Sequence, residues 1–157
     1  MSIPRTLNNF LDEHAVTYQL VPHPHSNSAS RTAEAAHVPG DAVAKAVLLV
    51  EEDGQYRLAV VPATRRVKLG QLHRLLGEHV GLATEDEVAS VFADCERGAI
   101  PALGAAYGLE TLLDDSMLEP RNVYFEAGDH ESLVRLRETD FLHLLGQPRR
   151  GQFSAHI

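Results

Sequence analysis

The segment Asp41-Ala-Val-Ala-Lys45-Ala-Val-Leu-Leu-Val50 decides the fold, because a single lysine interrupts its apolar run from Ala42 to Val50. The run is rich in β-branched residues and is too short to span a membrane, so it predicts a buried strand. Side chains alternate along a strand, so Lys45 shares one face with the aliphatic residues two positions before and after it.

Lys45 is unusual in this chain, because the only other lysine is Lys68 and the rest of the 14 basic residues are arginines. A lysine buried without a partner is costly, so its ammonium group should pair with a carboxylate, reach solvent or line a polar pocket. The pattern leaves two interpretations open. Lys45 is a snorkelling side chain near a strand end, or it is a functional lysine in a cleft.

The composition is that of a small acidic domain, with 157 residues, 44% of them hydrophobic and 23% charged. No stretch has the length of a transmembrane helix, and Met1-Ser-Ile-Pro4 lacks a signal-peptide pattern. A single cysteine excludes an internal disulfide and fits a reducing compartment, so we expect a cytoplasmic protein with no membrane partner. The net charge of -8 argues against wrapping of DNA or other nucleic acid, although it permits local contact with one nucleic-acid end.

Hydrophobic periodicity and turn residues predict the secondary structure. Ser30 is the expected N-cap of the second helix, Thr84 and Glu87 form a capping-box pattern, and Gly146 ends the last helix. Segment 26–30 is a polar loop. We expect helices over 4–14, 32–37, 67–76, 84–92 and 138–145, and strands over 16–21, 42–50, 56–62, 80–83, 109–113, 122–126 and 133–136.

These elements predict a mixed α/β (α+β) fold with a central, largely antiparallel sheet, because hairpin-linked strands dominate and helices lie at both ends and between them. No composition shift marks a linker. We therefore expect a single domain over 1–146, followed by a loosely ordered C-terminal tail over 147–157.

The segment Gly98-Ala-Ile-Pro101-Ala-Leu-Gly104 is the first candidate for a site beside Lys45. Glycines let the backbone approach a ligand, and exposed N–H groups can hold a carbonyl or an oxyanion. Pro101 fixes part of the loop. The same composition also fits an ordinary connection between a helix and a strand.

The order of these motifs resembles the YbaK and prolyl-tRNA-synthetase-associated editing domain, over roughly Leu7 to Leu145. The resemblance implies a barrel-like mixed sheet flanked by helices. The motifs that carry it follow one another along nearly the whole chain: Ala33-Glu-Ala-Ala36 with a Pro-Gly turn, Val43-Ala-Lys45-Ala-Val-Leu-Leu, the return to Pro62-Ala63, the helix 67–76, the loop ending in Pro101-Ala-Leu-Gly104, the turn Glu126-Ala-Gly128-Asp-His130 and the Asp140-Phe-Leu helix.

The resemblance implies trans-editing: hydrolysis of the ester that joins a wrong amino acid to the 3′ end of a tRNA, without metal or cofactor. Such editing is needed because small amino acids differ by too few contacts for one binding step. By this resemblance Lys45 positions the terminal nucleotide or phosphate, and backbone groups of Gly98 and Ala99 hold the aminoacyl carbonyl. A water assisted by the ribose hydroxyl attacks. The partners implied are the aminoacyl-tRNA 3′ end and an aminoacyl-tRNA synthetase.

Four further residues are substrate-binding candidates by the same resemblance: Arg97, Pro101, Gly104 and His130. The loop departs from the family pattern at two of its positions. Arg97 stands where the family usually has a glycine, four residues before the proline, and Ala102 replaces the usual phenylalanine or similar residue. The departure at Arg97 keeps a second hypothesis open, a module that binds an amino acid, a nucleotide or a tRNA 3′ end without cleaving it. A third hypothesis, a structural domain that docks on a synthetase, predicts an exposed apolar patch.

The remaining candidates carry less chemistry. His23 and His25 suit a metal, but no Cys or carboxylate near them in sequence completes a site, so we expect no metal. Cys95 acts as a nucleophile only if a histidine lies close in space. The loop acids Asp94 and Glu96 are a carboxylate pair or simply solvated. The basic cluster of Arg65, Arg66 and Lys68 either contacts tRNA phosphates or is a solvated helix start.

Overall fold

The computed structural model describes residues 3–26 and 28–157 and contains five α-helices and ten strands within them. Position 27 of the predicted polar loop lies outside these residues. The helices are α1 (Arg5–Glu13), α2 (Ala29–Ala35), α3 (Leu69–Leu76), α4 (Glu85–Val91) and α5 (Glu138–Leu145), with 3-10 turns at Gly40–Ala42, Gly104–Tyr107 and Asp115–Leu118. The strands are β1 (Gln19–Pro22), β2 (Val43–Glu51), β3 (Tyr56–Pro62), β4 (Arg65–Val67), β5 (Val80–Leu82), β6 (Glu110–Asp114), β7 (Asn122–Glu126), β8 (Ser132–Arg137), β9 (Arg149–Gly151) and β10 (Ser154–His156).

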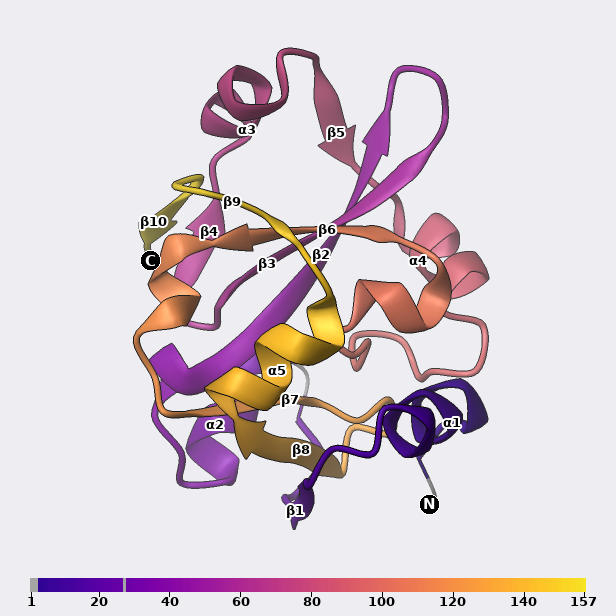
Figure 1. Cartoon of the computed structure of the whole chain (residues 1–157), viewed down its shortest axis with the longest axis vertical. Coiled ribbons are helices and arrows are strands. Elements are labelled where there is room, and N and C mark those ends of the chain that lie inside the picture. Colours follow the sequence, from indigo (N-terminus) through magenta and orange to yellow (C-terminus); the bar gives the residue numbers. More distant parts are fainter. Residues whose placement is uncertain (1–2, 27) are drawn as a thin grey trace.

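The main sheet has the strand order β1-β8-β7-β2-β3-β6-β9, and β5 pairs with β2 beside this path (Figure 1). Strand β2 runs antiparallel to β3 and β5 but parallel to β7, and β6 runs parallel to both β3 and β9. The predicted mixed α/β fold, with a central mixed sheet flanked by helices, is confirmed.

The alternation of β2 builds a core on each side of the sheet. Ala44 and Leu48 pack into a large cluster that includes buried leucines and a phenylalanine from α1 and α5. Leu49 faces the opposite way, into a second cluster with Leu72 of α3. Val43 packs against Ala33 of α2 in a third cluster. Lys45 therefore lies on the face covered by α2 and α3.

The prediction of a loosely ordered tail over 147–157 is wrong. Strand β9 pairs with β6 and β10 pairs with β4, although each strand has only three residues. Between them Phe153 is fully buried in the second cluster, and its N–H donates to a carboxylate oxygen of Asp114 (2.9 Å). A terminal segment that buries an aromatic side chain in this way is held by the core.

Local capping was predicted correctly at α4 and wrongly at α2. The capping box of Thr84 and Glu87 is present, whereas the N-cap of α2 is Ser28, whose side chain accepts a hydrogen bond from the Arg31 N–H. Ser30 lies within α2, and its hydroxyl donates instead to the Ala63 carbonyl. None of the helices within 3–26 and 28–157 has the length and hydropathy needed to cross a bilayer.

Candidate functional site

One edge of β2 is interrupted, and this interruption forms the site. On that edge β7 pairs with Val43 and Ala44, and β5 pairs with the end of β2 from Leu49 onward. Among the described residues no strand pairs with 45–47 on that edge. The segment from Gly98 to Gly104 is called the glycine loop. A cavity of about 430 Å³ opens at this edge, and its lining includes Ala46 of β2 together with Gly98 and Ile100 of the glycine loop.

Lys45 lies at the start of this interruption and is half-buried. Its Nζ donates a hydrogen bond to the Arg65 carbonyl (2.6 Å), and burial lowers the pKa of the Lys45 ammonium group below its ordinary value. An ammonium group has three donors, so two stay available for a ligand. Within the described part of the chain no carboxylate pairs with Lys45.

The glycine loop lines this cavity through Gly98 and Ile100. Gly98 has a φ of +81°, which a residue with a side chain rarely adopts. The Ala99 N–H closes a turn by donating to the Glu96 carbonyl (3.1 Å), so the predicted role of this amide in holding a carbonyl does not fit the structure. The N–H groups of Gly98 and Ile100, in contrast, have no acceptor among the described residues.

His130 packs directly against the glycine loop. His130 is buried, with 6% of its surface exposed, and its φ is +60°. Nε2 donates to the Arg97 carbonyl, which leaves Nδ1 as an acceptor without a partner in the described residues. A Cβ atom on Gly98 would lie 3.2 Å from His130 Cε1. The sequence predicts His130 as a substrate-selecting residue of the pocket; the structure places it against the glycine loop but not among the residues that line the cavity.

Of the other predicted residues, Pro101 and Gly104 lie outside the cavity, whereas Arg97 is among the residues that line it. Pro101 and Gly104 are buried, and a Cβ on Gly104 would lie 2.5 Å from Thr111 Oγ1, so this glycine serves close packing. The Arg97 guanidinium forms exposed ion pairs with Glu85 (3.8 Å) and Asp86 (3.1 Å) of α4. Its backbone, through the carbonyl, is the part that contacts His130.

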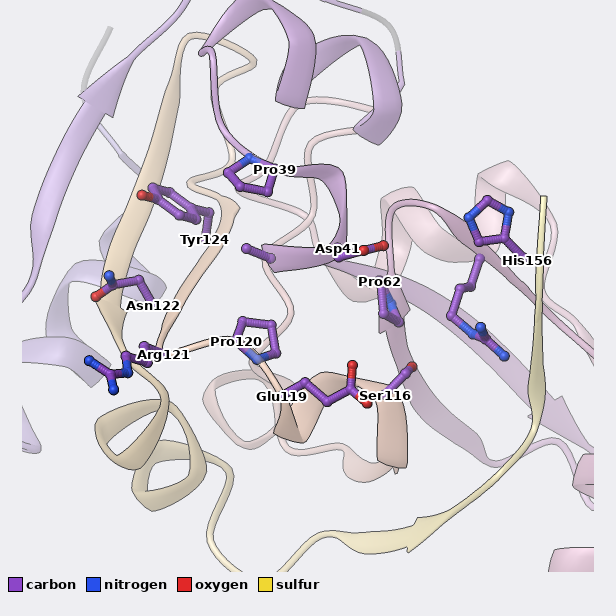
Figure 2. A pocket seen from close by; sticks show the side chains of 12 residues that line it. Pro39, Asp41, Pro62, Ser116, Glu119, Pro120, Arg121, Asn122, Tyr124 and His156 are labelled. Atoms are coloured by element: carbon purple, nitrogen blue, oxygen red, sulfur yellow. The ribbon is translucent and has the colours of Figure 1, made fainter.

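The basic cluster at β4 is separate from this cavity. Arg65 donates to both the side chain and the carbonyl of Ser154 and lines another cavity of about 500 Å³ (Figure 2). Arg66 is exposed and Lys68 is half-exposed at the N-cap of α3. Only Arg65 is connected to the site, through the carbonyl that accepts from Lys45.

One set of side chains has the composition of a metal site. Donor atoms of His25, Glu96 and His130 lie within 4.8 Å of one another, so the fold gives His25 the carboxylate partner that the sequence did not reveal. Three donor groups of this kind match the number of protein ligands that a catalytic zinc site uses. His23 belongs to a different pair, with its Nε2 3.5 Å from Glu126 Oε1.

Cys95 and Asp94 are engaged in structural contacts. Burial raises the pKa of the Cys95 thiol to about 11, so it is protonated at neutral pH and is a poor nucleophile. Its sulfur lies 3.2 Å from the Tyr107 hydroxyl. Asp94 accepts hydrogen bonds from that hydroxyl (2.8 Å) and from the Thr6 N–H (3.1 Å), whereas Glu96 lies near His25 and His130.

Comparison with known proteins agrees with this geometry. The model of the aminoacyl-tRNA editing domain matches residues 23–144. The chain belongs to the aminoacyl-tRNA editing domain family. The match includes β2, the glycine loop and the His130 turn, so every part of the interrupted edge lies within the editing domain. None of the curated proteins matches the chain.

Solved structures share the fold of this editing domain at low sequence identity. One, described as "hypothetical protein APE2540", is 18% identical, with a TM-score of 0.84 over 96% of this chain and 100% of its own. Another, described as "a putative trans-editing enzyme for prolyl tRNA synthetase", is 22% identical, with a TM-score of 0.83 over 98% of this chain and 99% of its own. A third, "a Putative signal transduction protein" from Marinobacter aquaeolei VT8, is 19% identical, with a TM-score of 0.79 over 98% of this chain but 31% of its own. The same fold therefore occurs alone and within a longer chain.

Proposed function

We propose that this editing domain hydrolyses the ester that joins an amino acid to the 3′ end of a mischarged tRNA, acting in trans. The observation that carries the proposal is the interrupted edge of β2: residues 45–47 lack a strand partner there, and Gly98 and Ile100, whose N–H groups are free, line a cavity at the same edge. A site for ester hydrolysis needs donors aimed at the carbonyl oxygen, where negative charge develops. The N–H group of Ile100, and not that of Ala99, is the second donor to the carbonyl oxygen, because the Ala99 N–H already donates to the Glu96 carbonyl.

In the proposed reaction a water attacks the aminoacyl carbonyl carbon, assisted by the neighbouring ribose hydroxyl. A carbon–oxygen bond to the water forms, the bond to the ribose oxygen breaks, and the proton lost by the water passes to that oxygen, so the products are a free amino acid and a tRNA with a free 3′ end. The carbonyl oxygen accepts from the Gly98 and Ile100 N–H groups. The Lys45 ammonium group, already held by the Arg65 carbonyl, binds the terminal nucleotide or its phosphate and so orients the ester.

The amino-acid side chain of the substrate occupies the cavity of about 430 Å³ in this proposal. Its walls are mainly aliphatic, with Ala46, Leu48 and Val88 among them. His130 supports the loop from behind through the Arg97 carbonyl and is therefore a positioning residue. An apolar cavity of this size favours a small or medium uncharged side chain.

The deciding experiment measures ester loss from a panel of mischarged and correctly charged aminoacyl-tRNAs, with Lys45→Ala beside the wild type. We expect at least one mischarged tRNA to be hydrolysed, and the Lys45 variant to lose about 100-fold or more of that rate, because a misplaced ester forfeits most of the orientation effect. Arg74→Ala, which removes an exposed cation from α3, is the matched control and should keep the wild-type rate.

The same panel separates the alternatives. Retention of an aminoacyl-tRNA without ester loss would support the non-catalytic binding module instead. Co-purification with a synthetase, with neither binding nor ester loss, would support a docking domain. That third function receives little support from the surface, because the exposed large apolar side chains of the described residues are scattered over separate segments: Leu20, Leu82 and Ile157.

A further inference from the structure

Strands β7 and β8 carry a polar face that the proposed site does not use. The strands alternate between the core and the outside, and Val123, Phe125 and Val134 are fully buried in the large cluster. Asn122 lies opposite Arg137 and Tyr124 lies opposite Arg135 in the antiparallel register, so these four side chains share the other face. Arg121 precedes β7 at the same end. We call this set the arginine face: Arg121, Asn122, Tyr124, Arg135 and Arg137.

The arginines of this face have no carboxylate partners. Among the described residues neither Arg121, Arg135 nor Arg137 forms an ion pair, whereas Arg57 and Arg97 elsewhere do. Arg135 donates to the Gln19 side-chain carbonyl (3.2 Å), and its guanidinium carbon lies 5.9 Å from the centre of the Tyr124 ring. In a chain with a net charge of -8, three cations without carboxylate partners among the described residues form a local site for an anion.

The arginine face is hollowed along its length. Arg121 and Asn122 line both the cavity of about 500 Å³ in Figure 2 and a neighbouring one of about 560 Å³, which also includes Arg135 and Arg137. Figure 2 shows Arg121, Asn122 and Tyr124 following one another along one side of the first cavity. The two cavities adjoin at these shared residues, and together they are called the groove.

The acidic groups beside the groove are Asp41, Glu119 and Glu138. Asp41 accepts a hydrogen bond from the Thr64 hydroxyl. None of the three is within ion-pairing distance of the arginine face among the described residues. The groove therefore keeps unneutralised cations even though carboxylates line it.

The groove leads toward Lys45. Tyr124 pairs with Val43 in the parallel register of β7 and β2, so both side chains lie on the same face of the sheet. Lys45 is the next residue of β2 on that face. Arg65, whose carbonyl holds the Lys45 ammonium group, lines the first cavity. One face of the sheet thus carries cations from Arg137 to Lys45.

We infer that the arginine face binds the phosphate backbone of the single-stranded 3′ end of an RNA and leads its terminal nucleotide to Lys45. This inference rests on the proposed function. Arginine guanidinium groups suit phosphates, and an aromatic ring with an arginine beside it offers a stacking surface for a base. Of the predicted basic cluster, Arg65 alone lines the groove together with Arg121 and Asn122.

The test measures binding of a 5′-labelled, uncharged tRNA by fluorescence anisotropy at several salt concentrations. The variant is Arg135→Gln with Arg137→Gln, and the control is Arg74→Gln with Arg150→Gln, which makes the same change in net charge at α3 and β9. We expect the face variant to bind about tenfold more weakly and to lose about 1.4 from the slope of log affinity against log salt, because each phosphate contact on a single strand contributes roughly 0.7. The control should retain both values.

A lysine variant and the rate of ester hydrolysis distinguish loss of phosphate binding from structural damage and from failure of the proposed function. Arg135→Lys with Arg137→Lys keeps the charge and should restore most of the salt slope, whereas a purely structural loss would not be restored. Equal binding by the face variant and the control, with equal slopes, overturns the inference. A wild type that binds tRNA through this face but hydrolyses no ester overturns the proposed function alone. Normal hydrolysis with an unchanged KM in the face variant overturns the inference alone.

Discussion

Gly98 is the residue whose substitution tests the loop most sharply. Its φ of +81° disfavours any residue with a side chain, and an added Cβ would also lie 3.2 Å from His130 Cε1. Gly54 has a similar φ of +86°, but nothing lies within 4 Å of its Cβ position. The two glycines therefore differ in contacts and not in backbone strain.

Gly98→Ala and Gly54→Ala should each cost about 1 kcal/mol of stability from the left-handed backbone alone. Only Gly98→Ala should also lower the rate of ester hydrolysis, by about tenfold or more, because its methyl group displaces the loop from His130. Urea unfolding and the deacylation assay measure the two effects. Equal hydrolysis rates in the two variants would show that the loop geometry is not used.

Glu126 makes stability depend on pH. Its carboxyl group is buried, and burial raises its pKa above the ordinary value of 4.5, although the Thr32 hydroxyl, His23 and His130 oppose this and Asp129 adds to it. The folded state therefore holds a proton that the unfolded chain has released. Because the folded state binds more protons, the free energy of unfolding decreases as pH rises from the ordinary pKa of the carboxyl toward the raised one.

Glu126→Gln should remove this contribution, since an amide of the same shape does not titrate. We expect its free energy of unfolding to vary less with pH in that window, and its stability relative to the wild type to improve as pH rises. Urea unfolding from mildly acidic to neutral pH measures this. The expectation fails if the two pH profiles run parallel.

At the scale of elements, the sequence predicts well the helices and strands that are set by local hydrophobic periodicity. The bounds of β3, β7 and α5 agree with the prediction, and the capping box of α4 is present. The start of α2 was misplaced because Ser28 and Ser30 have the same chemistry, and only tertiary contacts distinguish them. Strands β4, β9 and β10 were missed, because three polar or arginine-containing residues become a strand only when a distant partner is present.

The candidate site also has parts that the sequence predicts and parts that only the fold reveals. Lys45 stands out in its own strand, and the glycine loop has a recognisable composition. The engagement of the Ala99 amide, the free amide of Ile100 and the proximity of Glu96 to His25 depend on how the loop turns against His130. These contacts join segments far apart in the chain, so no local pattern predicts them.

At the scale of the molecule, the C-terminal segment completes the second core. Phe153 is fully buried there, while Ile157, four residues later, is 69% exposed. Phe153→Ala should lower the free energy of unfolding by about 3–5 kcal/mol, the usual cost of emptying a buried aromatic site. Ile157→Ala should leave it within about 0.5 kcal/mol of the wild type.

Urea unfolding of both variants measures the difference. A loss below about 1 kcal/mol for Phe153→Ala would mean that the segment contributes little, as a surface substitution would. Phe153 and Ile157 flank β10 on either side, so the contrast between their variants separates loss of core packing from a general effect of altering the C-terminal segment.

The parallel pairing of β2 with β7 also has a kinetic consequence. Joining Ala44 to Phe125 closes a loop of about 80 residues, and such a loop must form before the pairing can stabilise it. The β2–β3 hairpin can form early from nearby residues, whereas the interrupted edge acquires its flanking strand late. We therefore expect the β2–β3 hairpin to form early in refolding. The ability to bind a ligand at Lys45 should appear later, when β2 pairs with β7.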